Sequence, residues 1–380
     1  MTFVMEDLQL TYAQGGWLLS CVFLTMTIFF IPCGLASDRW GRKIFVVFSL
    51  LLTTIGSISL IWCSSFLPAM LTRIVIGIGY AMYVGPSVAM LANWFPSRQL
   101  GFAVGIWLVG YFLGMGLGEL IPPLLKEFGW RNAIWITASP GFIIALLCLI
   151  FTKDRPDEVG LPSLDINSQN TPSQNLNERE KLEWSWILKS KDLWICGLWV
   201  AGAYAGLSGV AAWLPTFANR VHGLSLELSG LISGLATGGV GIIMAIPGGL
   251  ISDRIKRRLP LMILTNVILG ISMIGIVYCD VGSLWLLIIF ALLIGIGVSL
   301  GVPAGLAYPA ERAGLEVAGS AVNMTEAIGS IGGLVSPWIM GLLFDIYHSW
   351  TVSFLVVGLA VIMSGFLCFL AKETHCAYLR

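Results

Sequence analysis

The chain has 380 residues, of which 57% are hydrophobic and 11% are charged, whereas soluble domains carry about 25% charged residues. Basic and acidic residues number 21 each, so no net charge attracts nucleic acid. Eight cysteines and three histidines are scattered, without the short paired spacings of a zinc site or a disulfide framework. This composition excludes a soluble domain, and we expect no metal, no cofactor and no enzyme chemistry.

Eleven apolar stretches are long enough to cross a bilayer as helices, which takes about 20 residues each. Short polar or Gly/Pro-marked breaks separate them, and tryptophans lie near many of their ends, as is typical of the membrane interface. Their approximate limits are 12–36, 44–66, 68–92, 101–125, 132–152, 192–216, 228–252, 259–280, 283–307, 318–344 and 350–371. The sequence therefore predicts an all-α membrane protein with eleven spans in contact with the lipid bilayer.

The basic residues lie mostly on one side of this arrangement. Alternate loops and the tail hold 17 of the 21, the opposite loops hold three, and one lies inside a span. Because loops rich in Lys and Arg stay in the cytoplasm, we expect the long loop 153–191 and the C-terminus to be cytoplasmic, in a plasma (inner) membrane. The loop is rich in Ser, Asn, Gln and Pro, which is typical of a flexible linker.

An internal repeat divides the chain into two halves. The segment Gly34-Leu-Ala-Ser-Asp38-Arg39 returns 215 residues later as Gly249-Leu-Ile-Ser-Asp253-Arg254. The same offset places the first five spans on the last five. We therefore expect an N-terminal bundle of five spans over 1–152, a linker over 153–191 and a C-terminal bundle of six spans over 192–380. The sixth span would have its partner upstream of residue 1, so we expect the first helix of the first half to be missing from this sequence, through a start codon placed too far downstream.

These motifs resemble those of the major facilitator superfamily over essentially the whole chain. The matching segments are 34–43 (GLASDRWGRK), its weaker copy 248–258 with Lys256 where a glycine is expected, 73–79 (RIVIGIG), 94–98 (WFPSR) and 129–131 (GWR). The resemblance implies a monomeric secondary transporter built from two pseudo-symmetric helical bundles. That family has twelve helices, and this sequence has eleven of them.

The resemblance assigns a gating role to the two motif copies. The residues concerned are Gly34, Asp38, Arg39, Gly41, Arg42 and Lys43, with Gly249, Asp253 and Arg254 in the second copy. A carboxylate held near basic side chains and a helix end can form a pairing that exists in only one packing of the halves. The alternative is that the charges reflect only topology and form weak, screened surface pairs.

Three ionisable residues lie within spans, where a charge is costly and needs a reason. Arg73 is either a partner of the substrate anion or proton, or a structural arginine that binds backbone carbonyls. Glu326, near Asn323 in the tenth span, is a candidate proton carrier, because burial favours the neutral carboxyl. Glu119 lies nearer the end of its span. The spans that the resemblance places around the central pathway add Tyr80, Tyr83 and Tyr204 to this candidate set.

Segments 213–217 (WLPTF), 129–131 and 155–161 (RPDEVGL) resemble the anion:cation symporters, oxalate/formate exchangers and nitrate/nitrite porters. We therefore expect a carrier of a small organic or inorganic anion, working by proton coupling or exchange. One alternative is a drug or metabolite efflux antiporter, although 118–123 (GELIPP) departs from the pattern of those exporters. The other is a non-transporting receptor or assembly factor, which would have no use for gating motifs in both halves.

Overall fold

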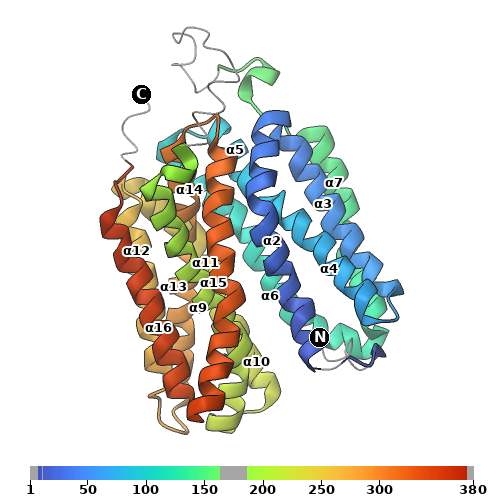
Figure 1. Ribbon diagram of the computed structural model, residues 1–380, viewed down its shortest axis with the longest axis vertical. Coiled ribbons are helices and arrows are strands. Elements are labelled where there is room, and N and C mark those ends of the chain that lie inside the picture. The colour runs from blue at the N-terminus through green and yellow to red at the C-terminus, as the bar shows by residue number, and fades with distance from the viewer. Residues whose placement is uncertain (1–6, 11, 163–185, 375–380) are drawn as a thin grey trace. The chain divides into compact units, whose positions relative to one another are not determined.

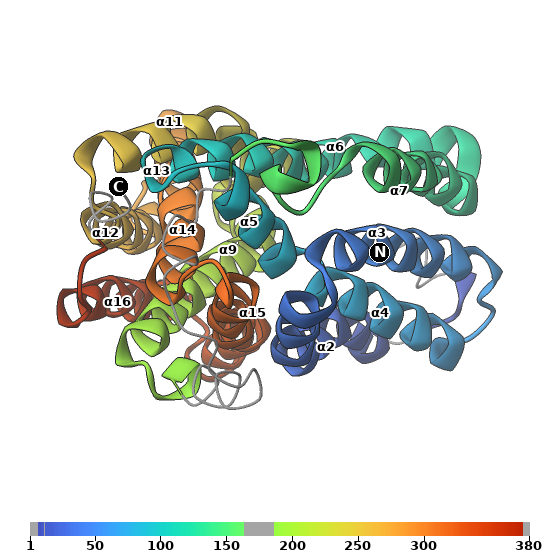
Figure 2. The same ribbon diagram turned by 90° about the horizontal axis from the view of Figure 1, so that it is seen from above.

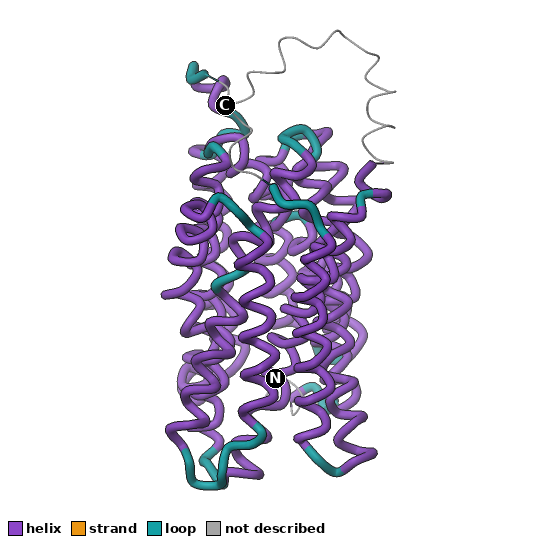
Figure 3. Tube along the Cα trace, turned by 90° about the vertical axis from the view of Figure 1, so that its left-hand side faces the viewer, coloured by secondary structure: helices purple, strands orange, loops and turns teal. Residues whose placement is uncertain are grey.

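The computed structural model describes residues 7–10, 12–162 and 186–374, and within these ranges the chain contains helices, turns and loops but no strand (Figure 3). Eleven stretches of the described residues are long and apolar enough to cross a membrane, which confirms the predicted number of spans. They are Ser20–Trp40, Arg42–Trp62, Phe66–Trp94, Ser97–Met115, Phe128–Phe151, Lys191–His222, Glu227–Ile255, Leu259–Ile276, Leu284–Ala313, Ala318–Tyr347 and Trp350–Leu370. The linker segment 163–185 lies outside the described residues.

The α-helices form these spans singly or in consecutive pieces. They are α2 (Tyr12–Trp40), α3 (Arg42–Ser59), α4 (Phe66–Ala81), α5 (Val84–Trp94), α6 (Ser97–Ala138), α7 (Pro140–Phe151), α9 (Lys191–His222), α10 (Leu226–Gly234), α11 (Val240–Ile255), α12 (Leu259–Ile276), α13 (Leu284–Ser299), α14 (Val302–Ala313), α15 (Ala318–Tyr347) and α16 (Trp350–Leu367). A π-helical turn, Leu235–Gly239, joins α10 to α11. Gly129, with φ of 73°, interrupts α6 and separates the fourth predicted span from the fifth.

Contacts between helices divide the chain into two compact units. The first unit contains 1–94, 120–189 and 313–327, and the second contains 95–119, 190–312 and 328–380. This division differs from the predicted bundles in two places: the start of α6 belongs with the second unit, and the start of α15 with the first. In the first unit α2, α3 and α4 lie side by side, with α7 against α3 (Figure 2).

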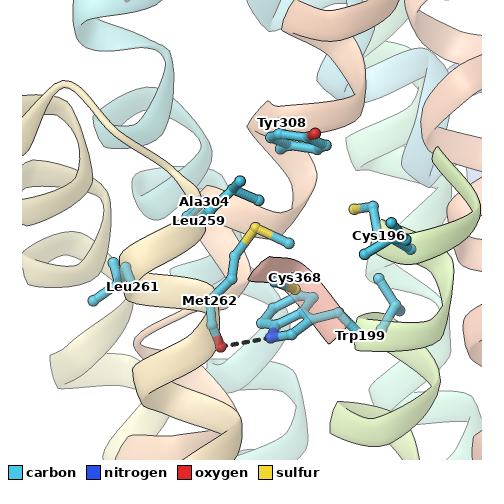
Figure 4. Packing of buried hydrophobic residues seen from close by; sticks show 10 residues of the cluster. Cys196, Trp199, Leu259, Leu261, Met262, Ala304, Tyr308 and Cys368 are labelled. Carbon is cyan, nitrogen blue, oxygen red and sulfur yellow. Dashed lines mark hydrogen bonds between the residues drawn. The ribbon is translucent and has the colours of Figure 1, made fainter. Parts of the chain in front are cut away.

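In the second unit α9, α12, α13 and α16 pack together (Figure 1). Trp199 on α9 lies in a cluster of buried side chains and donates its indole N–H to Met262 O on α12 at 2.6 Å (Figure 4). Asn266 on α12 donates to Trp199 O and to Ser364 Oγ on α16. Because lipid gives little hydrophobic drive for helices to associate, such hydrogen bonds and close packing hold the unit together.

One span in each half is broken at an equivalent place. The third span is interrupted between α4 and α5, and the ninth between α13 and α14. Pro86 and Pro303 each lie in the first turn after the break, where a missing N–H is tolerated but the preceding helix cannot continue undisturbed. The predicted spans over 68–92 and 283–307 are confirmed as stretches able to cross a membrane, and each consists of two helices that meet at such a break.

Candidate functional site

The first copy of the repeated motif joins α2 to α3 and is organised around the carboxylate of Asp38. Its Oδ1 accepts hydrogen bonds from Arg42 Nε at 3.1 Å and Nη2 at 3.0 Å, and both side chains are less than a tenth exposed. The carboxylate also accepts the backbone N–H groups of Gly319 and Ser320 and the Ser320 hydroxyl. These N–H groups belong to the first turn of α15, where a negative charge is stabilised by unpaired donors.

Arg42 extends the same network through its remaining donors. Nη1 donates to Ala89 O on α5 at 3.1 Å, and Nη2 donates to the carbonyls of Leu315 and Glu316 in the turn before α15. Gly34 makes the close approach possible, because a Cβ there would lie 2.9 Å from Ser320 Cα. Within the first unit, the motif therefore holds α2, α3, α5 and the start of α15 together.

The second copy forms an equivalent network in the second unit. Asp253 accepts the backbone N–H groups of Gly101 at 3.0 Å and Phe102 at 2.7 Å, near the start of α6. Its Oδ1 also accepts from Arg258 Nη1 at 2.6 Å. Gly249 has no room for a side chain, since a Cβ there would lie 2.1 Å from Gly101 O. In both copies a carboxylate thus caps the start of a helix from the other half of the sequence.

Arg258 is the residue that sequence reasoning missed. Its guanidinium is fully buried and also binds Glu311 through Nε at 3.2 Å and Nη2 at 2.6 Å, and donates to Ser97 O at 2.8 Å. The 215-residue offset aligns Arg42 with Arg257, but the partner of Asp253 lies one residue later. Lys256 takes a left-handed conformation with φ of 59°, where the first copy has Gly41 with φ of 103°. The run of basic residues after Asp253 was the available signal.

Three other predicted gating residues contribute less to these networks. Arg39 and Arg254 are exposed and form no ion pair with a described residue. Lys43 contributes its backbone N–H, which donates to Asp154 Oδ1 at 2.6 Å. Among the described residues, Arg42 and Arg258 are therefore the arginines that pair with the motif aspartates. The gating role of all these residues stays a prediction.

Asn323 closes the break in the third span. Gly85 N–H donates to its Oδ1 at 2.9 Å, and its Nδ2 donates to Ala81 O at 3.0 Å and to Phe30 O at 2.9 Å. In an uninterrupted helix, the Gly85 N–H would bond to Ala81 O four residues earlier. The fully buried amide is inserted between these two groups. Asn323 was predicted as a pathway residue, and the geometry makes it a clamp joining α2, α4, α5 and α15.

Arg73 lies on α4 without a carboxylate partner among the described residues. The titratable side chains around it are Tyr80, Cys21 and Cys63. Its Nε is buried and makes no hydrogen bond within the part of the chain that the structure describes. The alternative of an arginine satisfied by backbone carbonyls therefore finds no support at Nε.

The remaining pathway candidates fall in both units. Tyr80 is 42% exposed, two turns after Arg73 on the same helix, and Tyr83 follows at the break. Glu326, on α15 in the first unit, is 2% exposed. Tyr204 in the second unit packs against the buried cluster around Trp199. Glu119 lies in α6, but its side chain is outside the described residues.

Comparison with known proteins settles the family. The model of the Major Facilitator Superfamily matches residues 1–244 and 236–377. The chain belongs to this superfamily. A variant of the Escherichia coli fucose:proton symporter shares its fold with a TM-score of 0.75 at 12% identity, over 98% of this chain and 94% of that one. The predicted facilitator fold is thereby confirmed for this member of the superfamily.

Curated relatives of this superfamily member carry names of anion carriers. The phosphoglycerate transporter protein of Salmonella typhimurium is 27% identical over 77% of this chain and 66% of its own length. The hexuronate transporter of Bacillus subtilis is 25% identical, over 67% of this chain and 59% of its own length. The glycerol-3-phosphate transporter of B. subtilis is 27% identical, over 85% of this chain and 76% of its own length. The chain thus spans less than two thirds of the length of the first two.

Proposed function

We propose that this superfamily member is a secondary transporter that moves a small anion by alternating access, driven by a proton gradient or by exchange. The relatives named for phosphoglycerate, hexuronate and glycerol-3-phosphate support a carboxylated or phosphorylated solute. We further propose that the protein acts as a monomer in the plasma membrane, with the linker and C-terminus in the cytoplasm. The distribution of basic residues supports this orientation.

The observation that carries the proposal concerns Arg73, whose buried Nε makes no hydrogen bond to any residue that the structure describes. A cationic side chain at the centre of a bilayer costs about 2.5–3.5 kcal/mol on insertion scales, and such a cost is rarely retained without a partner. No carboxylate among the described residues neutralises Arg73, and its Nε is unbonded. A planar fork of donors matches carboxylate and phosphate oxygens. A bound anion would supply a negative charge and an acceptor that the described residues do not provide at this position.

The two motif networks support the alternating-access part of the proposal. Each binds the start of a helix from the opposite half of the sequence through one buried carboxylate. Such contacts can hold one packing of the protein and must break in another, which is how a bistable gate works. Glu326 is our candidate for the proton carrier, because its carboxyl is almost completely buried.

The test is uptake of radiolabelled glycerol 3-phosphate, 3-phosphoglycerate, glucuronate and galactarate into proteoliposomes containing the purified protein. We expect saturable uptake of at least one of these anions. Arg73→Gln should raise KM about 10–150-fold, the loss of a charge-assisted contact worth about 1.5–3 kcal/mol. The KM of the Arg73→Lys variant should fall between that of the unmodified protein and that of Arg73→Gln.

Arg220→Gln is the matched control, because Arg220 is exposed at the end of α9 and should leave KM unchanged. Normal KM in the Arg73→Gln variant would remove Arg73 from the substrate site. Uptake of none of the four anions, with the protein folded and incorporated, would refute the proposed substrate class.

A further inference from the structure

The short segment that follows the last helix of each half folds back onto the motif network of its own unit. In the first unit this segment contains Lys153 and Asp154. Asp154 Oδ1 accepts the backbone N–H of Lys43 at 2.6 Å, at the start of α3. Trp94 Nε1, at the end of α5, donates to Lys153 O at 3.0 Å, and Asn93 Nδ2 donates to Asp154 O at 3.0 Å. The segment is thus held at both its carbonyls and its carboxylate.

In the second unit the segment after α16 contains Lys372 and Glu373 and makes two equivalent contacts, one through the acid and one through the lysine carbonyl. Glu373 Oε1 accepts the backbone N–H of Arg258 at 2.8 Å, and both carboxylate oxygens accept from Leu259 N–H, at 3.3 and 3.4 Å. Tyr308 Oη on α14 donates to Lys372 O at 2.7 Å. In each unit a lysine carbonyl therefore binds an aromatic donor, and the acid that follows binds a helix start.

The two arrangements are related by the internal repeat. The pairs Lys43 and Arg258, Trp94 and Tyr308, and Asp154 and Glu373 are each separated by the repeat length to within four residues. Both acids directly follow a lysine just after an apolar span. Repetition of these two contacts in two halves of different sequence argues that they serve the function common to the halves.

The helix starts have a physical need for these carboxylates. The N-cap positions of α3 and α12 are Gly41 and Arg258, and neither makes a side-chain capping bond. The first N–H groups of a helix have no partner inside it, and a negative charge there is favourable. Asp154 and Glu373 supply that cap from about 110 residues away in sequence.

We propose that Lys153-Asp154 and Lys372-Glu373 are two equivalent straps that position the motif guanidinium groups, so that Asp154 and Glu373 are positioning residues for the gate. The capped N–H groups belong to Lys43, next to Arg42, and to Arg258 itself. Fixing these backbone groups fixes where each guanidinium meets its aspartate. The proposal rests on the proposed transport function, because only a moving gate requires such positioning.

The second strap is the more deeply connected of the two. Thr374 Oγ1 donates to Glu311 Oε2 at 3.0 Å, and Glu311 is the second carboxylate bound by Arg258. Lys372 N–H donates to Asp192 Oδ1 at 3.1 Å, and Asp192 also pairs with Arg312 at 2.7 Å. The strap at 372–374 therefore reaches α9, α12 and α14, and its loss should have the larger effect.

The test uses amide hydrogen exchange of the purified full chain, followed by mass spectrometry without any substrate. In Glu373→Gln we expect the N–H groups of Gly101 and Phe102, which bind Asp253, to exchange about fivefold faster, as for loss of a helix cap. The exchange rates of the Gly319 and Ser320 N–H groups, which bind Asp38, should be unchanged. Asp154→Asn should give the reverse pattern.

Matched controls are Asp157→Asn and Asp280→Asn, which remove exposed carboxylates and should change neither pair of amides. If a charge variant does not fold, Trp94→Phe and Tyr308→Phe remove only the aromatic donors, and each should give the same selective pattern at smaller size. Faster exchange confined to residues 43 or 258–259, without change at the distant helix starts, would overturn the proposal by making each strap a local cap.

A second measurement separates this proposal from the proposed function. In proteoliposomes, the strap variants should change the turnover of whichever anion is carried while leaving KM within twofold, because no strap residue contacts substrate. Selective exchange effects without transport of any anion would preserve the straps and refute the proposed function. Normal turnover together with altered exchange would refute the positioning role.

Discussion

Replacing Asp38 by Asn tests whether the first motif network controls the transport cycle. The substitution keeps the size of the side chain and removes its charge. The carboxylate accepts bonds from Arg42, Gly319 and Ser320 at a site where the Asp38 side chain is 8% exposed. The amide has only one acceptor oxygen, and its NH₂ group would face donors.

The free-energy cost of this substitution is set by the buried guanidinium that loses its partner. Arg42 would remain 7% exposed without its counter-charge, and removing one partner of a buried ion pair costs about 3–5 kcal/mol. Because the asparagine oxygen keeps part of the network, we take about 3 kcal/mol, which is a factor of about 150 in the population of this conformation. The protein should then dwell in the conformation in which the contact is broken. Turnover should fall at least about tenfold.

The assay combines turnover in proteoliposomes with amide hydrogen exchange at Gly319 and Ser320. We expect slower turnover and faster exchange at these two amides. The equilibrium affinity for the anion, measured by binding in the absence of transport, should be normal. Arg39→Gln is the control within the same motif, since Arg39 is exposed and its loss should cost no more than about 0.5 kcal/mol. Unchanged turnover and unchanged protection in Asp38→Asn would refute the gating argument.

Three further substitutions test other parts of the arrangement. Glu326→Gln should abolish accumulation against a gradient while preserving counterflow, because a neutral side chain resembles the protonated carrier; normal accumulation would exclude Glu326 from coupling. Asn323→Ala should destabilise the folded protein by about 3 kcal/mol, since it leaves Ala81 O and Gly85 N–H buried without partners; thermal unfolding in detergent measures this, and an unchanged midpoint would contradict the clamp. Gly249→Val should separate α11 from the start of α6, because even a Cβ would lie 2.1 Å from Gly101 O; intact protection of the Gly101 amide would show that the helices can absorb the side chain.

The features that depend on local sequence were predictable. Span number followed from the length of apolar stretches, and the repeat was visible because six residues around Asp38 return around Asp253 with few changes. The family followed from those motifs. These signals lie within short windows, where hydropathy and spacing are sufficient.

The features that depend on distant contacts were not predictable in the same way. Arg258 was missed because the second turn contains one residue more than the repeat offset allows, and only the folded chain shows which arginine reaches Asp253. Asp154 and Glu373 lie in loops, where no hydrophobic periodicity distinguishes a functional acid from an ordinary exposed one. Asn323 looked like a pathway residue because a buried amide has the same sequence signal whether it binds a solute or the backbone.

The clamp at Asn323 has a consequence for the order in which the protein is made. Of the groups it joins, Gly85 is the nearest in sequence and lies 238 residues before it in the chain. At about 5–20 residues per second, the ribosome needs about 12–48 s to travel from Gly85 to Asn323. Throughout that interval, the third span has been synthesised while the amide that completes its hydrogen bonding does not yet exist. The helices that Asn323 joins must therefore wait for the tenth span before they can reach their final packing, so insertion of the tenth span completes the hydrogen bonding of the third.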